Sequence, residues 1–274
     1  MLCQSPRMSA HIMAIVNQKG GVGKTTTTIN LAAALAELGQ RVLLVDLDPQ
    51  GNASTGLGLM RGDRGTSIYD ILVDGAGAGD AVVESSIGNL HIIPSSIDLA
   101  GAELEIGASA GRTTRLRDAL ANISDNYDYI LLDCPPSLNV LTVNALSAAA
   151  SVLVPLQSEF FALEGLSQLL KTVEMAKAQL NPRLYIEGVM LTMYDRRNRL
   201  SAQVAADVRE HLGRAVFDTL IPRNVRIAEA PSFGQSVIHY DPSSKGALAY
   251  MDLGREILTR HEARKNKRKQ GVEA

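Results

Sequence analysis

The segment His11–Thr28, which reads HIMAIVNQKGGVGKTTTT, decides the fold of this chain. It opens with the apolar run His11–Val16, typical of a buried strand, and passes through three glycines into Lys24–Leu38, whose pattern predicts a helix ended by Gly39. A glycine-rich turn between a strand and a helix is the setting of a phosphate-binding loop. Glycines let backbone N–H groups approach phosphate oxygens, and the helix N-terminus adds a favourable dipole.

Each position of this loop has a predicted role in holding a nucleotide. The backbone groups expected to surround the phosphates belong to Gly20, Gly21, Val22 and Gly23. Lys24 is expected to hold the β- and γ-phosphates, and Thr25 to offer its hydroxyl to Mg²⁺. Thr26 follows in the first helical turn, where its amide or hydroxyl would reach the α-phosphate. The predicted cofactors are therefore ATP and Mg²⁺.

Further apolar runs alternate with helical patterns along the chain and predict strands. They are Arg41–Val45, Leu90–Pro94, Asp128–Leu132, Ser151–Pro155, Leu184–Met193 and Ala215–Ile221. Several are hydrophobic at successive positions, which indicates burial on both faces, and the alternation with helices indicates a parallel sheet. We therefore expect an α/β fold: a three-layer, doubly wound, mostly parallel sheet with helices on both faces. Ligands are expected beyond the carboxyl ends of its strands.

The chain is expected to form a single domain over residues 11–259. Its 274 residues, 46% of them hydrophobic, are ample for one large core. Residues 1–10 are predicted to be a flexible N-terminal extension. Residues 260–274 are predicted to be a flexible basic tail, because Arg260–Lys269 contains six basic residues and one acid. The glycine-rich segment Gly56–Gly79 is interpreted as a surface loop.

Composition excludes several kinds of site. The net charge of −2 means that a nucleic-acid site would have to be a local basic patch. Two cysteines, Cys3 and Cys134, can form neither a disulfide framework nor a multi-cysteine zinc site. With no signal-like or membrane-spanning stretch, we expect a soluble cytoplasmic protein. The five histidines, which we assign to no cluster and no role, are His11, His91, His211, His239 and His261.

Three aspartates stand at the ends of predicted strands. Asp133 is expected to bind Mg²⁺ through a water molecule, and Asp46 is expected to join the same outer shell. Asp48 lies two residues beyond Asp46, where the chain has left the strand. Each aspartate alone is better explained by a turn or a helix cap, but together with Lys24 and Thr25 at the same edge of the sheet they favour the nucleotide site.

The stretch Lys19-Gly-Gly-Val-Gly-Lys-Thr25, with Gln18 where the common motif has glycine, resembles the deviant phosphate loop of the ParA/MinD family of ATPases. The chain looks most like the chromosomal ParA/Soj partition ATPases. The resemblance runs from about Ile12 to about Ile257, through Asp46–Gly58, Asp133–Pro136, Gln157–Gly165 and Ile221–Pro231.

The resemblance implies roles that the residues alone do not give. Lys19 would cross the interface of an ATP-dependent homodimer to touch the partner's nucleotide, and Asp48 would orient the attacking water. Together with Lys24 these are the implied catalytic residues. The implied adenine contacts are Pro222, Arg223 and Asn224.

The resemblance also implies DNA as a partner. Arg197 and Arg226 match DNA-contacting arginines of Soj-type relatives, and Arg196 and Arg199 lie in the same basic loop as Arg197. Contacts to phosphates would make the binding of double-stranded DNA non-specific. The other implied partner is a ParB-like protein that stimulates hydrolysis, so the protein would associate with the nucleoid. No stable membrane association is expected, because the basic tail lacks a large apolar face.

Three other functions remain open at this point. The first is a ParA-like positioner of another cargo, such as a chemoreceptor array or a carboxysome. The second is a metabolic P-loop enzyme of the dethiobiotin-synthetase or amidoligase type, which would need a pocket for a small-molecule acceptor. The third is an electron-transfer protein like the nitrogenase iron protein, which needs two cysteines near the dimer axis, whereas Cys3 precedes the whole fold.

Overall fold

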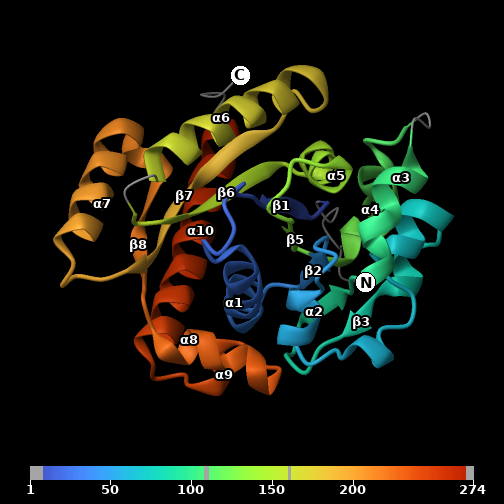
Figure 1. The fold of residues 1–274 in the computed structure, drawn as a ribbon, viewed down its shortest axis with the longest axis horizontal. Coiled ribbons are helices and arrows are strands. Elements are labelled where there is room, and N and C mark those ends of the chain that lie inside the picture. The colour runs from blue at the N-terminus through green and yellow to red at the C-terminus, as the bar shows by residue number, and fades with distance from the viewer. Residues whose placement is uncertain (1–8, 108–110, 160–161, 270–274) are drawn as a thin grey trace.

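The computed structural model describes residues 9–107, 111–159 and 162–269. An eight-stranded sheet in the order β3-β4-β2-β5-β1-β6-β7-β8 forms its centre (Figure 1). The strands are β1 (His11–Ile15), β2 (Val42–Asp46), β3 (Val83–Glu84), β4 (Leu90–Ile93), β5 (Tyr129–Asp133), β6 (Ser151–Gln157), β7 (Tyr185–Tyr194) and β8 (Val216–Pro222). All neighbouring pairs are parallel except β3 and β4. The predicted fold class is confirmed, and only the two-residue edge strand β3 was not predicted.

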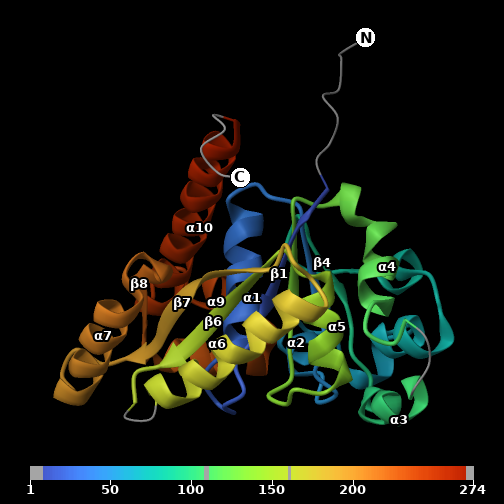
Figure 2. The same cartoon turned by 90° about the horizontal axis from the view of Figure 1, so that it is seen from above.

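Helices cover both faces of the sheet, as Figures 1 and 2 show. They are α1 (Lys24–Glu37), α2 (Asn52–Gly56), α3 (Ala102–Ile106), α4 (Arg115–Ala121), α5 (Val140–Ala148), α6 (Ala162–Gln179), α7 (Arg199–Leu212), α8 (Val225–Glu229), α9 (Val237–Tyr240) and α10 (Lys245–Lys269). Helices α1, α9 and α10 pack on one face, and α3 to α7 on the other.

Strand β1 shows why the apolar runs are continuous. Met13 and Ile15 belong to the core on the α1 side, while Ala14 belongs to the core on the α5 side, and all three are 0% exposed. Because successive side chains of a strand point to opposite faces, a strand covered on both sides needs apolar residues throughout. The sheet is therefore a layer buried on both faces, and the predicted site residues follow the carboxyl ends of its strands.

The C-terminal segment differs from the predicted flexible tail. Residues 260–269 are the last turns of α10, and His261 is only 6% exposed. Apolar residues Tyr250, Leu253 and Ile257 precede it at helical spacing on the buried side of α10. Residues 270–274, and residues 1–8 of the predicted N-terminal extension, lie outside the described residues.

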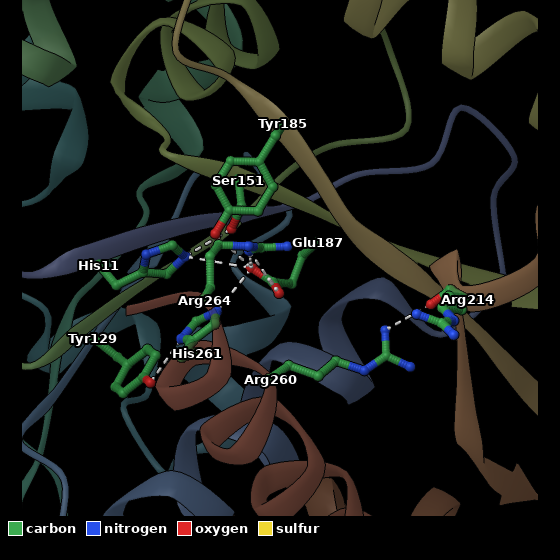
Figure 3. Close-up of polar contacts among 9 residues, drawn as sticks. All are labelled: His11, Tyr129, Ser151, Tyr185, Glu187, Arg214, Arg260, His261 and Arg264. Atoms are coloured by element: carbon green, nitrogen blue, oxygen red, sulfur yellow. Dashed lines mark hydrogen bonds and ion pairs between the residues drawn. The ribbon is translucent and has the colours of Figure 1, made fainter. Parts of the chain in front are cut away.

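Two further expectations need correction. The segment Gly56–Gly79 is not simply a surface loop, since Ile68 and Leu72 within it are 0% exposed and belong to the core. The histidines were assigned to no cluster, yet His11 and His261 meet beside Glu187 at the amino edge of the sheet (Figure 3). Within the described parts of the chain, no helix has the length and apolar character needed to span a membrane.

Candidate nucleotide-binding site

The phosphate loop joins the end of β1 to the start of α1. Gly21 and Gly23 have φ angles of 74° and 91°, a left-handed conformation that would strain any side chain. The hydroxyl of Thr192, on β7, donates a hydrogen bond of 2.9 Å to the carbonyl of Val22. The loop is thus curved by its glycines and fixed from the neighbouring part of the sheet.

Lys24 is the first residue of α1 and is only 7% exposed. Its Nζ donates to the carbonyl of Lys19 at 3.2 Å, so the ammonium lies beneath the loop. Burial lowers the pKa of Lys24, while the nearby charges of Asp133 and Asp48 raise it. A buried ammonium next to exposed loop amides is suited to bind an anion such as a phosphate.

Asp133 ends β5 with its side chain fully buried beneath the loop. Its Oδ1 accepts a hydrogen bond of 3.0 Å from the Thr28 hydroxyl, whereas its buried Oδ2 has no partner within the described residues. Burial and the charge of Asp46 raise the pKa of Asp133 to about 8, against hydrogen bonds from Thr25 and Thr28. An unpaired carboxylate oxygen close to the Thr25 hydroxyl fits a hydrated Mg²⁺, which prefers oxygen ligands and keeps several waters.

Asp46 lies beside Asp133 in the register of β2 and β5. Its Oδ2 accepts from the backbone amide and the hydroxyl of Ser54, at 2.8 and 2.7 Å, and its Oδ1 from the amide of Asp48 at 3.3 Å. Burial raises its pKa to about 6. The contacts show Asp46 holding α2 and the Asp48 turn in place, and its part in the magnesium shell stays a prediction.

Asp48 lies half-buried just beyond β2. Its Oδ1 accepts a hydrogen bond of 3.0 Å from the amide of Gln50, which fixes the turn. A cleft of about 380 Å³ opens beside it and is also lined by Pro135 and Asn139. There is room here for a water molecule, although the role of Asp48 in orienting one stays a prediction.

Lys19 is held from two sides. Its amide donates to Oδ1 of Asn17 at 2.9 Å, and Asn17 in turn donates to the carbonyl of Pro155 at 2.8 Å. Its Nζ forms a 2.8 Å ion pair with Glu159, in which the two side chains are 46% and 47% exposed. Opening such an exposed pair costs at most about 1 kcal/mol, so the side chain is free to take another partner.

A pocket of about 270 Å³ lies next to the loop and brings five predicted residues together. Gly23 and Thr26, expected at the phosphates, and Pro222, Arg223 and Asn224, expected at the adenine, all line it. The remaining lining residues are Thr192, Met193, Ile221, Ile227, Ala228 and Tyr250. This largely apolar wall suits a flat base. No local pattern points to Thr192 or Tyr250, which come from β7 and α10.

A second depression, the basic groove, holds about 690 Å³. Four cations and two acids line it, among others: Arg196, Arg197, Arg223, Lys245, Asp195 and Asp252. Lys245 was not predicted, because a single lysine at the start of α10 carries no pattern. Of the four arginines expected to bind DNA, Arg199 and Arg226 are not among the residues that line it.

The two principal arginines are exposed but already paired. Arg197 is 90% exposed and contacts Asp195 at 3.1 Å. Arg226, at the start of α8, pairs with Glu229 at 2.9 Å and Asp241 at 3.3 Å. Ion pairs at such exposed positions are weak, so a phosphate can replace the carboxylate at little cost.

Cys134 follows Asp133 and is 1% exposed. Burial raises the pKa of its thiol, which keeps the sulfur protonated and unreactive. Its position in the core is that of a small apolar residue. Cys3 lies outside the described residues.

Comparison with known proteins agrees with this geometry. A family model described as an AAA domain matches residues 10–186. The chain is 58% identical over 258 residues to the chromosome partitioning protein ParA of Caulobacter vibrioides, covering 93% of this chain and 97% of that protein. It is 54% identical over 246 residues to the sporulation initiation inhibitor protein Soj of Bacillus subtilis, covering 90% and 97%.

A solved structure also superimposes on this chain. The crystal structure of cobyrinic acid a,c-diamide synthase from Mycobacterium smegmatis with bound ADP and magnesium matches it with a TM-score of 0.81 and 38% sequence identity. The match covers 92% of this chain and 96% of that one. The loop geometry agrees with the matches to ParA and Soj, which cover nearly the whole chain at 54% to 58% identity. The chain therefore belongs to the ParA/MinD family of P-loop ATPases, with the ParA and Soj chromosome-partitioning ATPases among its relatives.

Proposed function

We propose that this protein is an ATP-driven switch for partitioning DNA in the cytoplasm. Mg-ATP joins two copies face to face, the dimer binds double-stranded DNA of the nucleoid without sequence preference, and hydrolysis stimulated by a ParB-like partner releases it. The names of the relatives, which refer to chromosome partitioning, support this proposal.

The hydrolytic part of the cycle uses groups already gathered at the carboxyl edge of the sheet. Lys24 holds the β- and γ-phosphates, and Asp48 positions water in the adjacent cleft. Thr25 and Asp133 hold the hydrated magnesium ion. When bound, Mg²⁺ neutralises charge on the phosphates, and positioning of this kind supplies most of the catalysis in phosphoryl transfer.

One observation carries the link between nucleotide and DNA: the adenine pocket and the basic groove share a wall. Pro222 and Arg223, at the end of β8, line both depressions. The first turns of α10 also contribute to both, through Tyr250 in the pocket and Lys245 in the groove. A nucleotide that fixes Pro222 and Arg223 in the pocket therefore also fixes the part of the groove that these two residues line.

Dimerisation would turn a weak contact into a strong one. A single groove with a few cations gains little energy from DNA, whereas two grooves on one rigid dimer bind with an effective concentration set by their spacing. If the dimer touches about six phosphates, its affinity should fall about a thousandfold between roughly 50 and 200 mM salt. ATP is then the signal that switches DNA binding on.

The DNA proposal is tested with Arg197→Glu and Arg226→Glu, made separately. Fluorescence anisotropy with random-sequence duplex DNA, with and without Mg-ATP, should show at least tenfold weaker binding by each variant. Arg183→Glu, an exposed arginine near the opposite edge of the sheet, is the matched control and should bind as the wild type does. Full DNA affinity in both test variants, with dimerisation intact, would refute the assignment of this surface.

Dimerisation is tested with Lys19→Ala. Because the Lys19 ammonium pairs with its own Glu159 in this monomer, the variant should bind ATP about as well as the wild type. Analytical ultracentrifugation with Mg-ATP should then find a monomer where the wild type is dimeric. A dimer of wild-type stability would remove the crossing role of Lys19.

A second candidate function is favoured by the likeness to the Mycobacterium smegmatis structure, whose name is that of an amide-forming enzyme. Such an enzyme would use the same phosphate loop to activate a carboxylate for amidation. Incubation with cobyrinic acid, glutamine and Mg-ATP, followed by mass spectrometry, distinguishes the two functions. An amidated product would favour the metabolic enzyme, and its absence alongside ATP-dependent DNA binding would favour the partition switch.

A further inference from the structure

Three potential metal ligands converge at the amino edge of the sheet, opposite the nucleotide site. His11 comes from β1, Glu187 from β7 and His261 from α10, so the cluster joins three elements that are distant in the sequence (Figure 3). Glu187 and His261 are 3% and 6% exposed. Nothing in the phosphate loop or the basic groove uses these residues.

The ligand atoms are close enough to share one ion. Nε2 of His261 lies 2.8 Å from Oε2 of Glu187, and Nε2 of His11 lies 3.7 Å from the same oxygen. No two of the three ligand atoms are farther apart than 4.8 Å. Neighbouring ligands of a tetrahedral zinc ion are about 3.3 Å apart, so side-chain adjustments of an ångström or so would complete the geometry.

The surrounding contacts orient these ligands as metal sites do. The Tyr129 hydroxyl lies 2.8 Å from Nδ1 of His261, so it fixes the ring with Nε2 facing Glu187. Partners on the second ring nitrogen are a regular feature of metal-binding histidines. Nε2 of His11 lies 2.8 Å from the Ser151 hydroxyl, which can rotate away and leave this ring nitrogen to an ion.

The cluster is also reachable. A pocket of about 400 Å³ is lined by His11, Tyr129, Tyr185 and His261, among others. A small hydrated ion can enter through it, and a water molecule can remain as a fourth ligand. Two histidines, one carboxylate and an open position form a set that zinc accepts.

We propose that His11, Glu187 and His261 form a binding site for a divalent transition-metal ion of the zinc class, which ties α10 to β1 and β7. The ion takes the place of the hydrogen that Nε2 of His261 directs at Glu187. The ring changes tautomer, so Nε2 loses its hydrogen and Nδ1 gains one, which it donates to the Tyr129 oxygen. Affinity follows the usual order for nitrogen and oxygen ligands, so Zn²⁺ binds more tightly than Mn²⁺.

Arg264 opposes the ion and offers a sharp test. Its guanidinium lies 3.3 Å from Oε1 of Glu187 and 4.0 Å from the ring centre of Tyr185, so it already compensates the buried carboxylate. A cation entering the cluster is repelled by Arg264 and, at longer range, by Lys265. Removing the charge in Arg264→Gln should therefore strengthen metal binding, which a purely structural cluster would not show.

The experiment uses the full chain, freed of metal with EDTA and without nucleotide, in a Cys3→Ser background because a thiolate would itself bind zinc. Isothermal titration with Zn²⁺ should give one ion per chain, and the ion should raise Tm. His11→Ala should bind at least tenfold more weakly, and Arg264→Gln about tenfold more tightly. The matched control is His239→Ala, since His239 on α9 also faces a glutamate, Glu37 at the end of α1, at 3.0 Å.

The gain in Arg264→Gln keeps the test decisive even where His11→Ala is poorly folded, because misfolding does not tighten binding. Uptake of no Zn²⁺ by the wild type would overturn the proposal. Equal Zn²⁺ affinity in the wild type, His11→Ala and Arg264→Gln would overturn it as well, since the ion would then lie elsewhere. If His239→Ala lowered the Zn²⁺ affinity as much as His11→Ala does, the proposal would likewise be overturned.

Discussion

At the carboxyl edge of the sheet, buried Asp133 keeps one oxygen without a partner within the described residues, whereas at the amino edge both oxygens of Glu187 are bonded. His261, Tyr185 and Arg264 supply those bonds. An unpaired buried polar atom destabilises a fold unless a ligand satisfies it. The contrast teaches that the unpaired oxygen at the carboxyl edge lowers the stability of the fold without ligand and leaves an acceptor for one. The bonded carboxylate at the amino edge holds α10 to the sheet.

The largest expected effect is a loss of Mg-ATP affinity when Lys24 at the carboxyl edge is replaced. Lys24→Ala removes the buried ammonium that would face the phosphates, so affinity for Mg-ATP should fall at least about a hundredfold in isothermal titration. Tm without nucleotide should change little or rise, because the variant no longer buries a charge. Lys177→Ala, an exposed lysine on α6, is the control. Unaltered affinity in Lys24→Ala would mean that the phosphate loop has been misplaced.

Asp48→Ala should separate binding from chemistry at the same edge. Because Asp48 is expected to hold the water and not the nucleotide, ATP affinity should stay near that of the wild type while kcat falls about a hundredfold. A coupled phosphate-release assay measures the rate, and the ATP dimer should accumulate. Asp63→Ala, an exposed aspartate, serves as control. Wild-type turnover would exclude Asp48 from the mechanism.

At the amino edge the same kind of change should affect stability alone. His261→Ala removes the imidazole bonds of the Glu187 carboxylate and the Tyr129 hydroxyl, so the free energy of unfolding in urea should fall by about 2 kcal/mol. Measured in EDTA, this loss is independent of any bound metal. ATP affinity should stay within about twofold of the wild type. A large loss of ATP affinity would show that the two edges are coupled.

The smallest expected effect tests how firmly the sheet holds the loop. Thr192→Val keeps the shape of the side chain but removes its hydrogen bond to the Val22 carbonyl, so ATP affinity should weaken about fivefold, or roughly 1 kcal/mol. Thr219→Val, which breaks a bond to Glu256 away from the loop, is the matched control. Equal affinities in both variants would show that the glycines alone shape the loop.

The carboxyl edge could be predicted because its signals are local. Strand, glycine turn, Lys24 and Thr25 are contiguous, and the parallel sheet places Asp48 and Asp133 at the same edge. The adenine contacts needed a family resemblance. Their partners Thr192 and Tyr250 could not be found from sequence, because they reach the pocket from elements that only the fold brings together.

The amino edge was missed for a different reason. His11, Glu187 and His261 lie on three separate elements, and no spacing connects them. For α10 a signal was present: Tyr250, Leu253, Ile257 and His261 recur at intervals of three and four residues, the buried stripe of a helix. The six basic residues of Arg260–Lys269 adjoin the end of that stripe, and their charge led to the prediction of a solvated tail.

The packing of α10 against α1 has a consequence for synthesis of the chain. At Gly254 an added Cβ would lie 3.0 Å from Leu38 and 3.3 Å from Ala34, so the two helices are in close contact there. Ribosomes release α1 more than two hundred residues before α10. Throughout translation the surface around Ala34 therefore stays uncovered, and a nascent chain halted before Lys245 exposes apolar surface that chaperones recognise.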